Sequence, residues 1–427
     1  MGKNYSNIKI TLRGILERIL SAFVAQARMS KAALIRQRHG IQLKGVVLLK
    51  ILNFCPYQIV TGRGSIHHLK DIRANRTLIV SGAKSMRRAG VIDKITGCLS
   101  SEELRVLEGI ANEPSISDIE KGLAVMREFQ PDTVIAVGGG SVLDAAKGML
   151  LFYEFPWLSF ERIQEETIPP KREKTQFIAI PSTSGTGSEV TRTSVITDPK
   201  KQLKVPIINI CLKPDVAILD ADLVDGMPKK LVAETGMDAL THALECYLRH
   251  DLDDFDEVLA KGAVEGILKW LPESYLKGTP ESREKVHNYQ SIAGISFTNV
   301  GVALVHGIAH AVGAYFHMPH GLANAIILPY VTEFNRQDER VRGKLAYLSK
   351  LCGCEDIVRA IWELDRLLEI PPTLQKAGIA ETDFLEAFDK VAQSSLLGAT
   401  RFNPVPVDLD TMKSLLKTVY YGKQGQA

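Results

Sequence analysis

The stretch TVIAVGGGSVLDAAKG at residues 133–148 decides how this chain folds. Its first residues, from Thr133 to Val137, are mostly β-branched and apolar and predict a buried strand. Glycines follow at 138–140, and the sequence from Ser141 onward predicts a helix. A strand, a glycine turn and a helix N-terminus bring free backbone N–H groups to the positive end of the helix dipole. The stretch therefore predicts a diphosphate site, and the plainer alternative is a tight turn without a ligand.

A second stretch, FIAIPSTSGTGSEVTRTS at residues 177–194, repeats this pattern. A strand from Phe177 to Ile180 is expected to lead into a loop of glycines and hydroxyl side chains. Thr183, Thr186 and Ser188 in this loop could hydrogen-bond to phosphate or ribose. One such loop is usually only a connection. Two of them at strand ends predict a nucleotide lying across the carboxyl edge of a parallel sheet.

Histidines are concentrated in two segments, and together these segments predict a divalent metal site. Asp238 and His242 are four residues apart in ETGMDALTHALECY, so one helix face can present both to the same ion. His306 and His310 have the same spacing. Pro319 should end that helix and present His320 from the following turn.

One carboxylate and several imidazoles suit Fe(II), Zn(II) or a similar ion better than Mg or Ca, which prefer oxygen ligands. An isolated D-x-x-x-H pair is more often a core or surface feature than a metal site. The two segments together favour the metal site. His317, three residues before His320, is expected at the surface or around the ligands.

Five blocks of the sequence, in this order over roughly residues 54–420, resemble the iron-containing, or group III, alcohol dehydrogenase family. They are GGGSVLDAAKG (138–148), PSTSGTGSEVT (181–191), DVAILDADLVDGMP (215–228), ETGMDALTHALECY (234–247) and VHGIAHAVGAYFHMPHGLANAIILP (305–329). The resemblance implies a fold like that of dehydroquinate synthase. It also implies a metal-dependent, NAD(P)-linked enzyme that transfers hydride between nicotinamide and a primary alcohol or short aldehyde, with the metal polarising the substrate oxygen.

The resemblance also implies roles for individual residues. Asp238, His242, His306 and His320 match the metal ligands, and His310 matches a residue that passes the alcohol proton to solvent. Phe297 matches an aromatic wall of the substrate pocket, and Lys204 matches a lysine near the cofactor; ordinary core and surface roles are their alternatives. The other residues expected to bind the cofactor are Gly139, Gly140, Ser141, Asp144, Thr183 and Thr186. A homo-oligomer, in its simplest form a homodimer, is expected as well.

The end of another predicted strand, in TLIVSGAKSMRRAG at residues 77–90, bears on the choice of cofactor. NAD-preferring members of the family commonly place an acidic residue here, where it binds the ribose hydroxyls. This chain has Gly82, followed by Lys84, Arg87 and Arg88. A small residue leaves room for a 2′-phosphate and the cations attract it, so NADP is predicted over NAD. The alternative is a basic helix start without a ligand.

The 427 residues, 45% of them hydrophobic and 24% charged, are enough for two domains and a sizeable core. Predicted strands end near residue 225, and long helical stretches follow at 229–250, 254–275 and 283–313. We therefore predict an α/β dinucleotide-binding domain at 51–225 and an all-α metal-binding and substrate domain at 226–427. The six cysteines show no disulfide framework, which fits a reducing compartment and a cytoplasmic enzyme. The lone Cys352-Gly-Cys354 pair lacks the further ligands that a metal site needs.

Residues 1–50 form a basic amphipathic extension. They hold ten Lys/Arg and one acidic residue, whereas the rest of the chain holds 42 Lys/Arg and 48 Asp/Glu. An apolar stripe along residues 7–28 could pack on the enzyme, lie on an anionic membrane surface or serve in targeting. The apolar stretches are interrupted by charges, so neither a secretory signal nor a membrane-spanning helix is expected. Nucleic-acid binding is not expected, because no recognisable module accompanies the basic residues.

Other functions explain only part of these patterns. A metal-dependent hydrolase would use the Asp/His set but would leave the two glycine loops unexplained. A nucleotide-binding protein without catalysis would explain the loops but not the metal ligands. A glycerol dehydrogenase-like polyol dehydrogenase and a maleylacetate reductase, from the same superfamily, would use both features and remain the alternative substrate classes.

Overall fold

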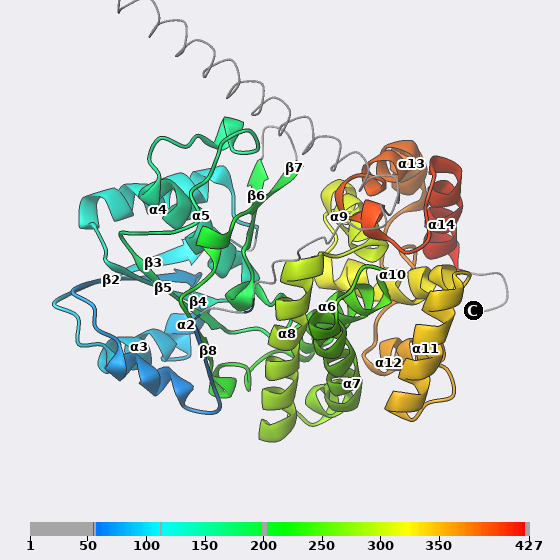
Figure 1. The fold of residues 1–427 in the computed structure, drawn as a ribbon, viewed down its shortest axis with the longest axis horizontal. Coiled ribbons are helices and arrows are strands. Elements are labelled where there is room, and N and C mark those ends of the chain that lie inside the picture. Colours follow the sequence, from blue (N-terminus) through cyan, green and yellow to red (C-terminus); the bar gives the residue numbers. More distant parts are fainter. Residues whose placement is uncertain (1–53, 55–56, 112, 199–202, 423–427) are drawn as a thin grey trace, which may run out of the picture. The chain divides into compact units, whose positions relative to one another are not determined.

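The computed structural model describes residue 54 and residues 57–111, 113–198 and 203–422 (Figure 1). The described residues all belong to one compact unit, 53–427. The predictions for the basic extension, including the stripe at 7–28, lie outside the described residues.

The first half of the described chain builds a parallel sheet with the strand order β1-β8-β5-β4-β2-β3. The central strand β4 is buried along its whole length, as a strand covered on both faces must be. The strands are β1 (Gln58–Thr61), β2 (Arg76–Gly82), β3 (Glu103–Ile110), β4 (Thr133–Gly138), β5 (Gln176–Pro181) and β8 (Val216–Leu219). The strands predicted at 133–137 and 177–180 are therefore confirmed, each slightly longer than predicted.

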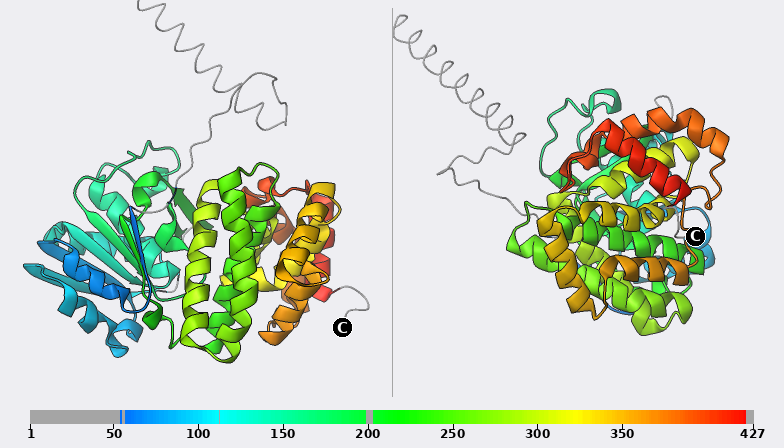
Figure 2. Two further views of the ribbon diagram at one scale, coloured as in Figure 1. Left: turned by 60° about the horizontal axis from the view of Figure 1, so that its bottom comes forward. Right: turned by 90° about the vertical axis from the view of Figure 1, so that its right-hand side faces the viewer.

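Helices cover both faces of this sheet, as Figure 2 shows. Alternate residues of a strand point to opposite faces, so Val134 packs towards α4 and α5, whereas Ile135 packs towards η1 and α3. The covering elements are η1 (Ser65–Asp71), α3 (Val91–Cys98), α4 (Ile116–Phe129) and α5 (Gly140–Glu154). A short helix, α2 (Ser85–Arg88), follows β2, and β6 (Thr193–Asp198) pairs with β7 (Leu203–Ile208) as an antiparallel hairpin.

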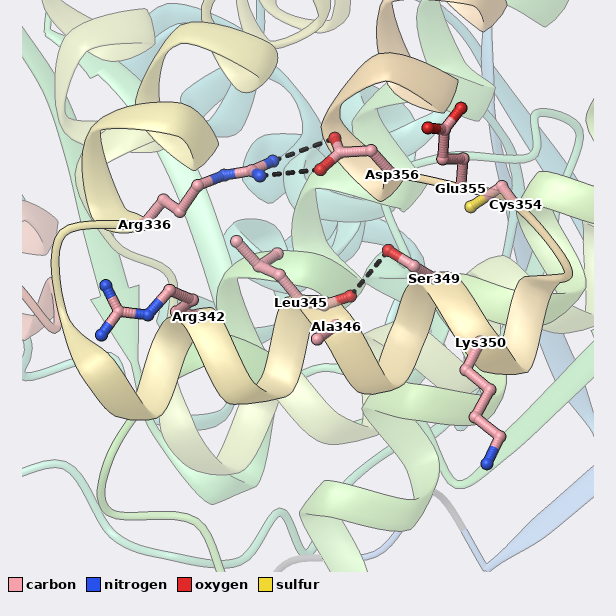
Figure 3. A pocket seen from close by; sticks show the side chains of 9 residues that line it. All are labelled: Arg336, Arg342, Leu345, Ala346, Ser349, Lys350, Cys354, Glu355 and Asp356. Atoms are coloured by element: carbon pink, nitrogen blue, oxygen red, sulfur yellow. Dashed lines mark hydrogen bonds and ion pairs between the residues drawn. The ribbon is translucent and has the colours of Figure 1, made fainter.

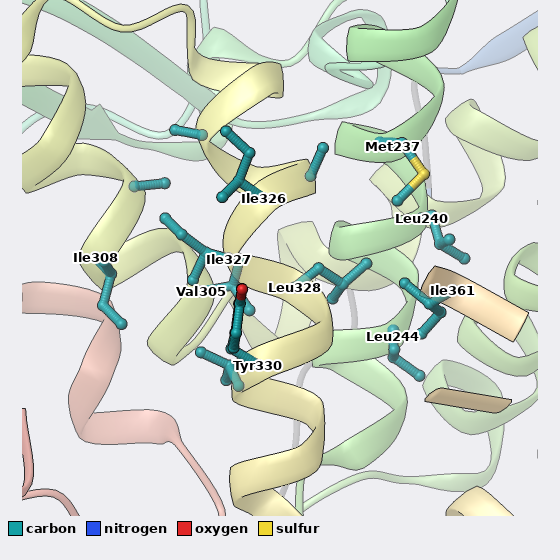
Figure 4. Packing of buried hydrophobic residues seen from close by; sticks show 14 of the residues in the cluster. Met237, Leu240, Leu244, Val305, Ile308, Ile326, Ile327, Leu328, Tyr330 and Ile361 are labelled. Carbon is teal, nitrogen blue, oxygen red and sulfur yellow. The ribbon is translucent and has the colours of Figure 1, made fainter. Parts of the chain in front are cut away.

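From Lys229 to Tyr421 the described chain is helical. The helices are α6 (Lys229–Leu248), α7 (Asp254–Leu276), α8 (Pro280–Val300), α9 (Leu304–Phe316), α10 (His320–Asn335), α11 (Glu339–Cys352), α12 (Ile357–Leu367), α13 (Glu381–Ser395) and α14 (Leu409–Tyr421). Met237 and Leu240 of α6, Ile327 of α10 and Ile308 of α9 belong to one buried cluster (Figure 4). The predicted fold class, an α/β part followed by an all-helical part, is confirmed.

The prediction of one helical stretch over 283–313 is wrong, because the chain turns between α8 and α9. The helices are bent by 99° at this break. Gly301 ends α8 with a φ of 78°, which favours glycine, and the next helix begins at Leu304. Among the described residues no single helix has the length and apolar composition to cross a membrane; α8 and α9 meet that test only as this bent pair.

Candidate metal and cofactor site

Three helices bring the predicted metal ligands together. Asp238 and His242 lie one turn apart on α6, His306 lies in the first turn of α9, and His320 is the first residue of α10. Asp238 Oδ1 is 3.9 Å from Nε2 of His242, 3.9 Å from Nε2 of His306 and 3.7 Å from Nε2 of His320. Ligands about 2.1 Å from a tetrahedral ion are roughly 3.4 Å apart, so these separations fit a shared ion with a small contraction.

The chemistry of this group also fits a cation. Burial raises the pKa of Asp238 and lowers the pKa values of His306 and His320, so desolvation disfavours the charged form of each. A carboxylate oxygen and neutral imidazole nitrogens can all serve as ligands of one cation. The side chains of Asp238, His242 and His306 are 4%, 7% and 3% exposed, whereas that of His320 is 35% exposed. The site therefore opens to solvent beside His320.

Glu245 is a functional residue that the sequence reasoning missed. Its Oε2 lies 2.6 Å from His306 Nδ1, so the opposite ring nitrogen, Nε2, is left to face the metal site. The same carboxylate accepts hydrogen bonds from the backbone N–H groups of Ala303 and Val305. Glu245 therefore fixes both the ring of His306 and the start of α9, as partners of metal-bound histidines commonly do.

Asn324 was also missed, and its amide nitrogen lies close to three of the ligand atoms. The Asn324 side chain is fully buried, and its Nδ2 donates to Asp238 Oδ1 at 2.7 Å. It is also 3.2 Å from Nε2 of both His306 and His320. Spacing could have revealed both residues, because Glu245 lies seven residues after Asp238 and Asn324 lies four residues after His320, each on the ligand-bearing face of its helix.

His310 and Phe297 border the metal group, as the resemblance implied. The His310 ring stacks on that of His320 with the ring centres 5.2 Å apart. His310 is exposed, yet desolvation by the surrounding protein, followed by the charge of Lys204, lowers its pKa. Phe297 of α8 stacks on His242 with the ring centres 4.4 Å apart. His317 ends α9 as an exposed residue with a φ of 52° and is not part of the ligand group.

The two predicted cofactor loops lie against each other at the carboxyl edge of the sheet. Gly138 pairs with Pro181, so β4 and β5 end side by side. A Cβ at Gly140 would lie 2.7 Å from the Thr186 side chain, and a Cβ at Gly139 would lie 3.4 Å from that of Thr183. The glycines therefore leave room at the N-terminus of α5, where Ser141 is the second residue.

Asp144 and Lys147, on α5, hold these loops together from inside. Asp144 accepts hydrogen bonds from Ser188 Oγ and from the backbone N–H of Val195. Lys147 is fully buried and donates to the backbone oxygens of Ser188 and Thr193 and to the hydroxyls of Ser188 and Thr191. Burial lowers the pKa of Lys147 to about 8. The cofactor role predicted for Asp144 stays a prediction, and Lys147 is a structural support that the sequence reasoning missed.

Two of the cations expected near the cofactor, Arg87 and Lys204, lie against acidic side chains. Gly82 is the last residue of β2, and a Cβ there would lie 3.5 Å from Val142 of α5. Arg87 Nε lies 2.9 Å and 3.0 Å from the two carboxylate oxygens of Glu108, so part of its charge is neutralised. Lys84, also exposed, precedes α2.

Lys204 lies on β7, where its Nζ is 2.8 Å from Glu113 Oε1. Its charge nevertheless acts on His310 and His320, since it contributes to lowering both of their pKa values.

A separate cavity of about 320 Å³ lies between α11 and the start of α12 (Figure 3). Its main polar feature is a two-fold ion pair between Arg336 and Asp356. None of the metal ligands or of the predicted cofactor residues lines this cavity, so we do not assign the chemistry to it.

Two glycine-containing loops of the kind that bind nucleotides, together with a group of metal-type ligands in the same compact unit, are typical of metal-dependent dehydrogenases. Residues 56–221 match the model of the iron-containing alcohol dehydrogenases, and residues 232–420 match the C-terminal model of the same family. The NADPH-dependent butanol dehydrogenase of Clostridium saccharobutylicum is 42% identical over 86% of this chain and 98% of its own length.

Two solved structures agree. The iron-containing alcohol dehydrogenase of Thermococcus thioreducens is 33% identical with a TM-score of 0.81, covering 87% of this chain and all of its own. Sulfoacetaldehyde reductase of Bifidobacterium kashiwanohense, solved with NAD+, is 25% identical with a TM-score of 0.79, over 88% of this chain and all of its own. The chain belongs to the iron-containing alcohol dehydrogenase family. It is a metal-dependent alcohol dehydrogenase, an oxidoreductase that acts on CH–OH groups, as the sequence predicted.

Proposed function

We propose that this protein uses NADP(H) and Fe(II), with Zn(II) as the alternative ion, to interconvert short primary alcohols and aldehydes. The approach of three imidazole nitrogens to within 3.9 Å of one carboxylate oxygen, Asp238 Oδ1, carries this proposal. The same donors suit both ions. Butanol and butanal are the first substrates to test, because the butanol dehydrogenase relative is 42% identical over 86% of this chain.

The residues of the site divide the work of binding and orientation. Asp238, His242, His306 and His320 would hold the ion, with Glu245 fixing the His306 ring. The bound ion would polarise the substrate oxygen, and the nicotinamide would give or take the hydride. Because the metal group opens beside the half-exposed His320, the substrate oxygen would approach from that side.

His310 and Phe297 would act on the substrate side of this opening. The exposed His310 ring next to His320 can pass the alcohol proton between the substrate oxygen and solvent. The Phe297 ring covers His242 and keeps water from that side of the ligand group. Loss of His310 should therefore slow turnover without removing the metal.

The preference for NADP rests on the end of β2. Gly82 has no carboxylate to bind a 2′-hydroxyl or to repel a 2′-phosphate, and the exposed Lys84 supplies a positive charge two residues later. The name of the butanol dehydrogenase relative, which includes NADPH dependence, supports this choice. The NAD+ complex of the sulfoacetaldehyde reductase makes NAD the alternative.

The test is to remove metal with a chelator, restore Fe(II) or Zn(II) without oxygen, and follow NADPH and NADH oxidation with butanal. We expect turnover only after metal is restored, faster with NADPH, and a shift of at least tenfold towards NADH in a Gly82→Asp variant. Glycerol and maleylacetate serve as competing substrates. Full activity in the stripped protein would refute the metal assignment, and an unchanged cofactor ratio in Gly82→Asp would refute the cofactor argument.

A further inference from the structure

One face of α8 contacts a metal ligand and also the loop of hydroxyl residues that follows β5 (residues 182–191, the hydroxyl loop). His287, Gln290, Gly294 and Phe297 follow one another at spacings of three or four residues, so they lie along the same face. The first three contact residues 184–190 of the loop, and Phe297 stacks on the metal ligand His242. A single rigid helix therefore spans the distance from the cofactor side to the metal side.

Gln290 makes the central bridge between this helix and the loop. Its side-chain Oε1 accepts from the backbone N–H of Gly187 at 2.8 Å, and its Nε2 donates to Glu189 Oε1 at 2.6 Å. The N–H of Gly187 can only donate, so the oxygen of the Gln290 side-chain amide must face it and the amide nitrogen must face Glu189. Gln290 is 1% exposed and Glu189 is 0% exposed. Breaking the bridge would leave buried polar groups unpaired, which is costly.

Three further contacts hold the same surfaces together. His287 Nδ1 is 3.0 Å from Ser184 Oγ. Gly187 has a φ of 60°, and a Cβ on it would lie 2.8 Å from Gly294 Cα; a Cβ on Gly294 would lie 2.7 Å from a methyl carbon of Val190. The loop and the helix thus meet backbone to backbone, with no space in which one could slide along the other.

The loop is fixed on its other side by α5. Lys147 of α5 donates to Ser188 and Thr191, and Thr186 lies against Gly140 at the start of that helix. The hydroxyl loop is therefore clamped between the helix that begins at the glycine turn and the helix that carries Phe297. A shift at the Gln290 bridge would change the position of α5 relative to α8.

We propose that Gln290 is a positioning residue that sets the distance between the bound nicotinamide and the metal group. It acts through the loop and touches neither partner. Hydride transfer needs the reacting atoms roughly 3–3.5 Å apart, and a misplacement of about 1 Å can cost about 100-fold in rate. The assignment rests on the dehydrogenase activity and adds a residue that neither binds the metal nor reacts.

The first test compares Gln290→Met, which keeps the length but removes the donor and the acceptor, with Tyr289→Phe. Tyr289 is the matched control, because it is the neighbouring residue on α8 and packs over Gly266 of α7. We expect kcat of Gln290→Met to fall about 10- to 100-fold. We expect its Kd for Fe(II) or Zn(II), from chelator competition, and its Kd for NADPH, from nicotinamide fluorescence, to change less than about threefold. A purely structural role predicts a lower Tm with unchanged kcat well below that Tm, and this result would overturn the proposal.

A second pair of variants decides the question even if Gln290→Met does not fold. Gln290→Glu alone places two carboxylates against each other, whereas adding Glu189→Gln restores one amide facing one carboxylate. We expect the single variant to be slow and the combination to recover kcat to within about threefold of the wild type. A double variant as slow as Gln290→Glu alone would refute the proposed role of the Gln290–Glu189 bridge. A wild-type enzyme active only with NADH would refute the NADP proposal and leave this comparison valid with NADH.

Discussion

Replacing Glu245 with glutamine tests whether the carboxylate behind His306 supports metal binding. In the structure this carboxylate takes three hydrogen bonds, from His306 Nδ1 at 2.6 Å, Ala303 N at 2.9 Å and Val305 N at 2.5 Å. Oε2 serves the first two donors and Oε1 serves the third. Glutamine has one side-chain oxygen, so in the Glu245→Gln variant it can keep the first two bonds only if its NH2 group faces the N–H of Val305.

The size of the effect follows from this count. Leaving one buried hydrogen-bonding group without its partner costs about 1–3 kcal/mol in the free energy of unfolding. A neutral amide also makes the His306 ring a weaker base than a carboxylate does. Loss of such a partner typically weakens metal binding about 10- to 100-fold, which corresponds to about 1.4–2.8 kcal/mol. We therefore expect a lower affinity for Fe(II) or Zn(II) together with a lower Tm.

The assay is chelator competition for the metal, performed well below the Tm of the variant. Glu234→Gln is the matched control, because Glu234 lies on the same helix and its Oε1 is 3.8 Å from Lys230 Nζ. The reasoning fails if Glu245→Gln binds metal within about twofold of the wild type, or if the control loses as much affinity.

Three other predictions address the cofactor loops, the core and the metal. In Gly140→Ala the added methyl would lie 2.7 Å from Thr186, so we expect the Kd for NADPH to rise at least about tenfold while metal affinity is unchanged. Adding Thr186→Ala should recover part of the lost affinity. Nicotinamide fluorescence measures the Kd of both variants. Asp365 is buried, neither of its oxygens has a hydrogen-bond partner in the described chain, and burial raises its pKa, so its contribution to stability falls as pH rises above the ordinary value near 4. Urea unfolding should therefore show Asp365→Asn gaining stability relative to the wild type between pH 5 and pH 8; an equal difference at both pH values would contradict this. Restoring metal to stripped protein at about 100 times its Kd should stabilise the fold by about 2.7 kcal/mol, seen as a higher Tm, and an unchanged Tm would contradict binding at the buried ligands.

The parts of the site that depend on local spacing could be predicted from the sequence. Asp238 and His242 share a helix face because they are four residues apart, and a glycine turn after a buried strand opens α5. A break before His320 was expected and is present, although α9 ends already at Phe316 and His320 begins α10 instead of lying in a turn. These predictions needed only the geometry of one helix or one turn.

The break between α8 and α9 could not be predicted in the same way. Residues 283–313 have no proline and continue a helical pattern, so Gly301 alone was a weak signal. In the fold, Glu245 of α6 binds the N–H groups of Ala303 and Val305 and so stabilises a new helix start. A partner more than fifty residues away in the sequence decides where α9 begins, and only the tertiary structure reveals it.

The same limit explains why residues between the two halves of the site were missed. Gln290 and Glu189 carry no recognisable motif together, since they are about a hundred residues apart. Their role is seen only in the structure, where one buried amide pairs with one carboxylate and one backbone N–H. Metal ligands and glycine turns can be recognised in the sequence, because an ion and a phosphate each bind particular types of atom. Holding an ion and a nicotinamide at a fixed distance requires only a rigid connection, and many different residue pairs can form one. In this enzyme the connection is therefore recognised from side-chain packing, and kinetic measurements test it.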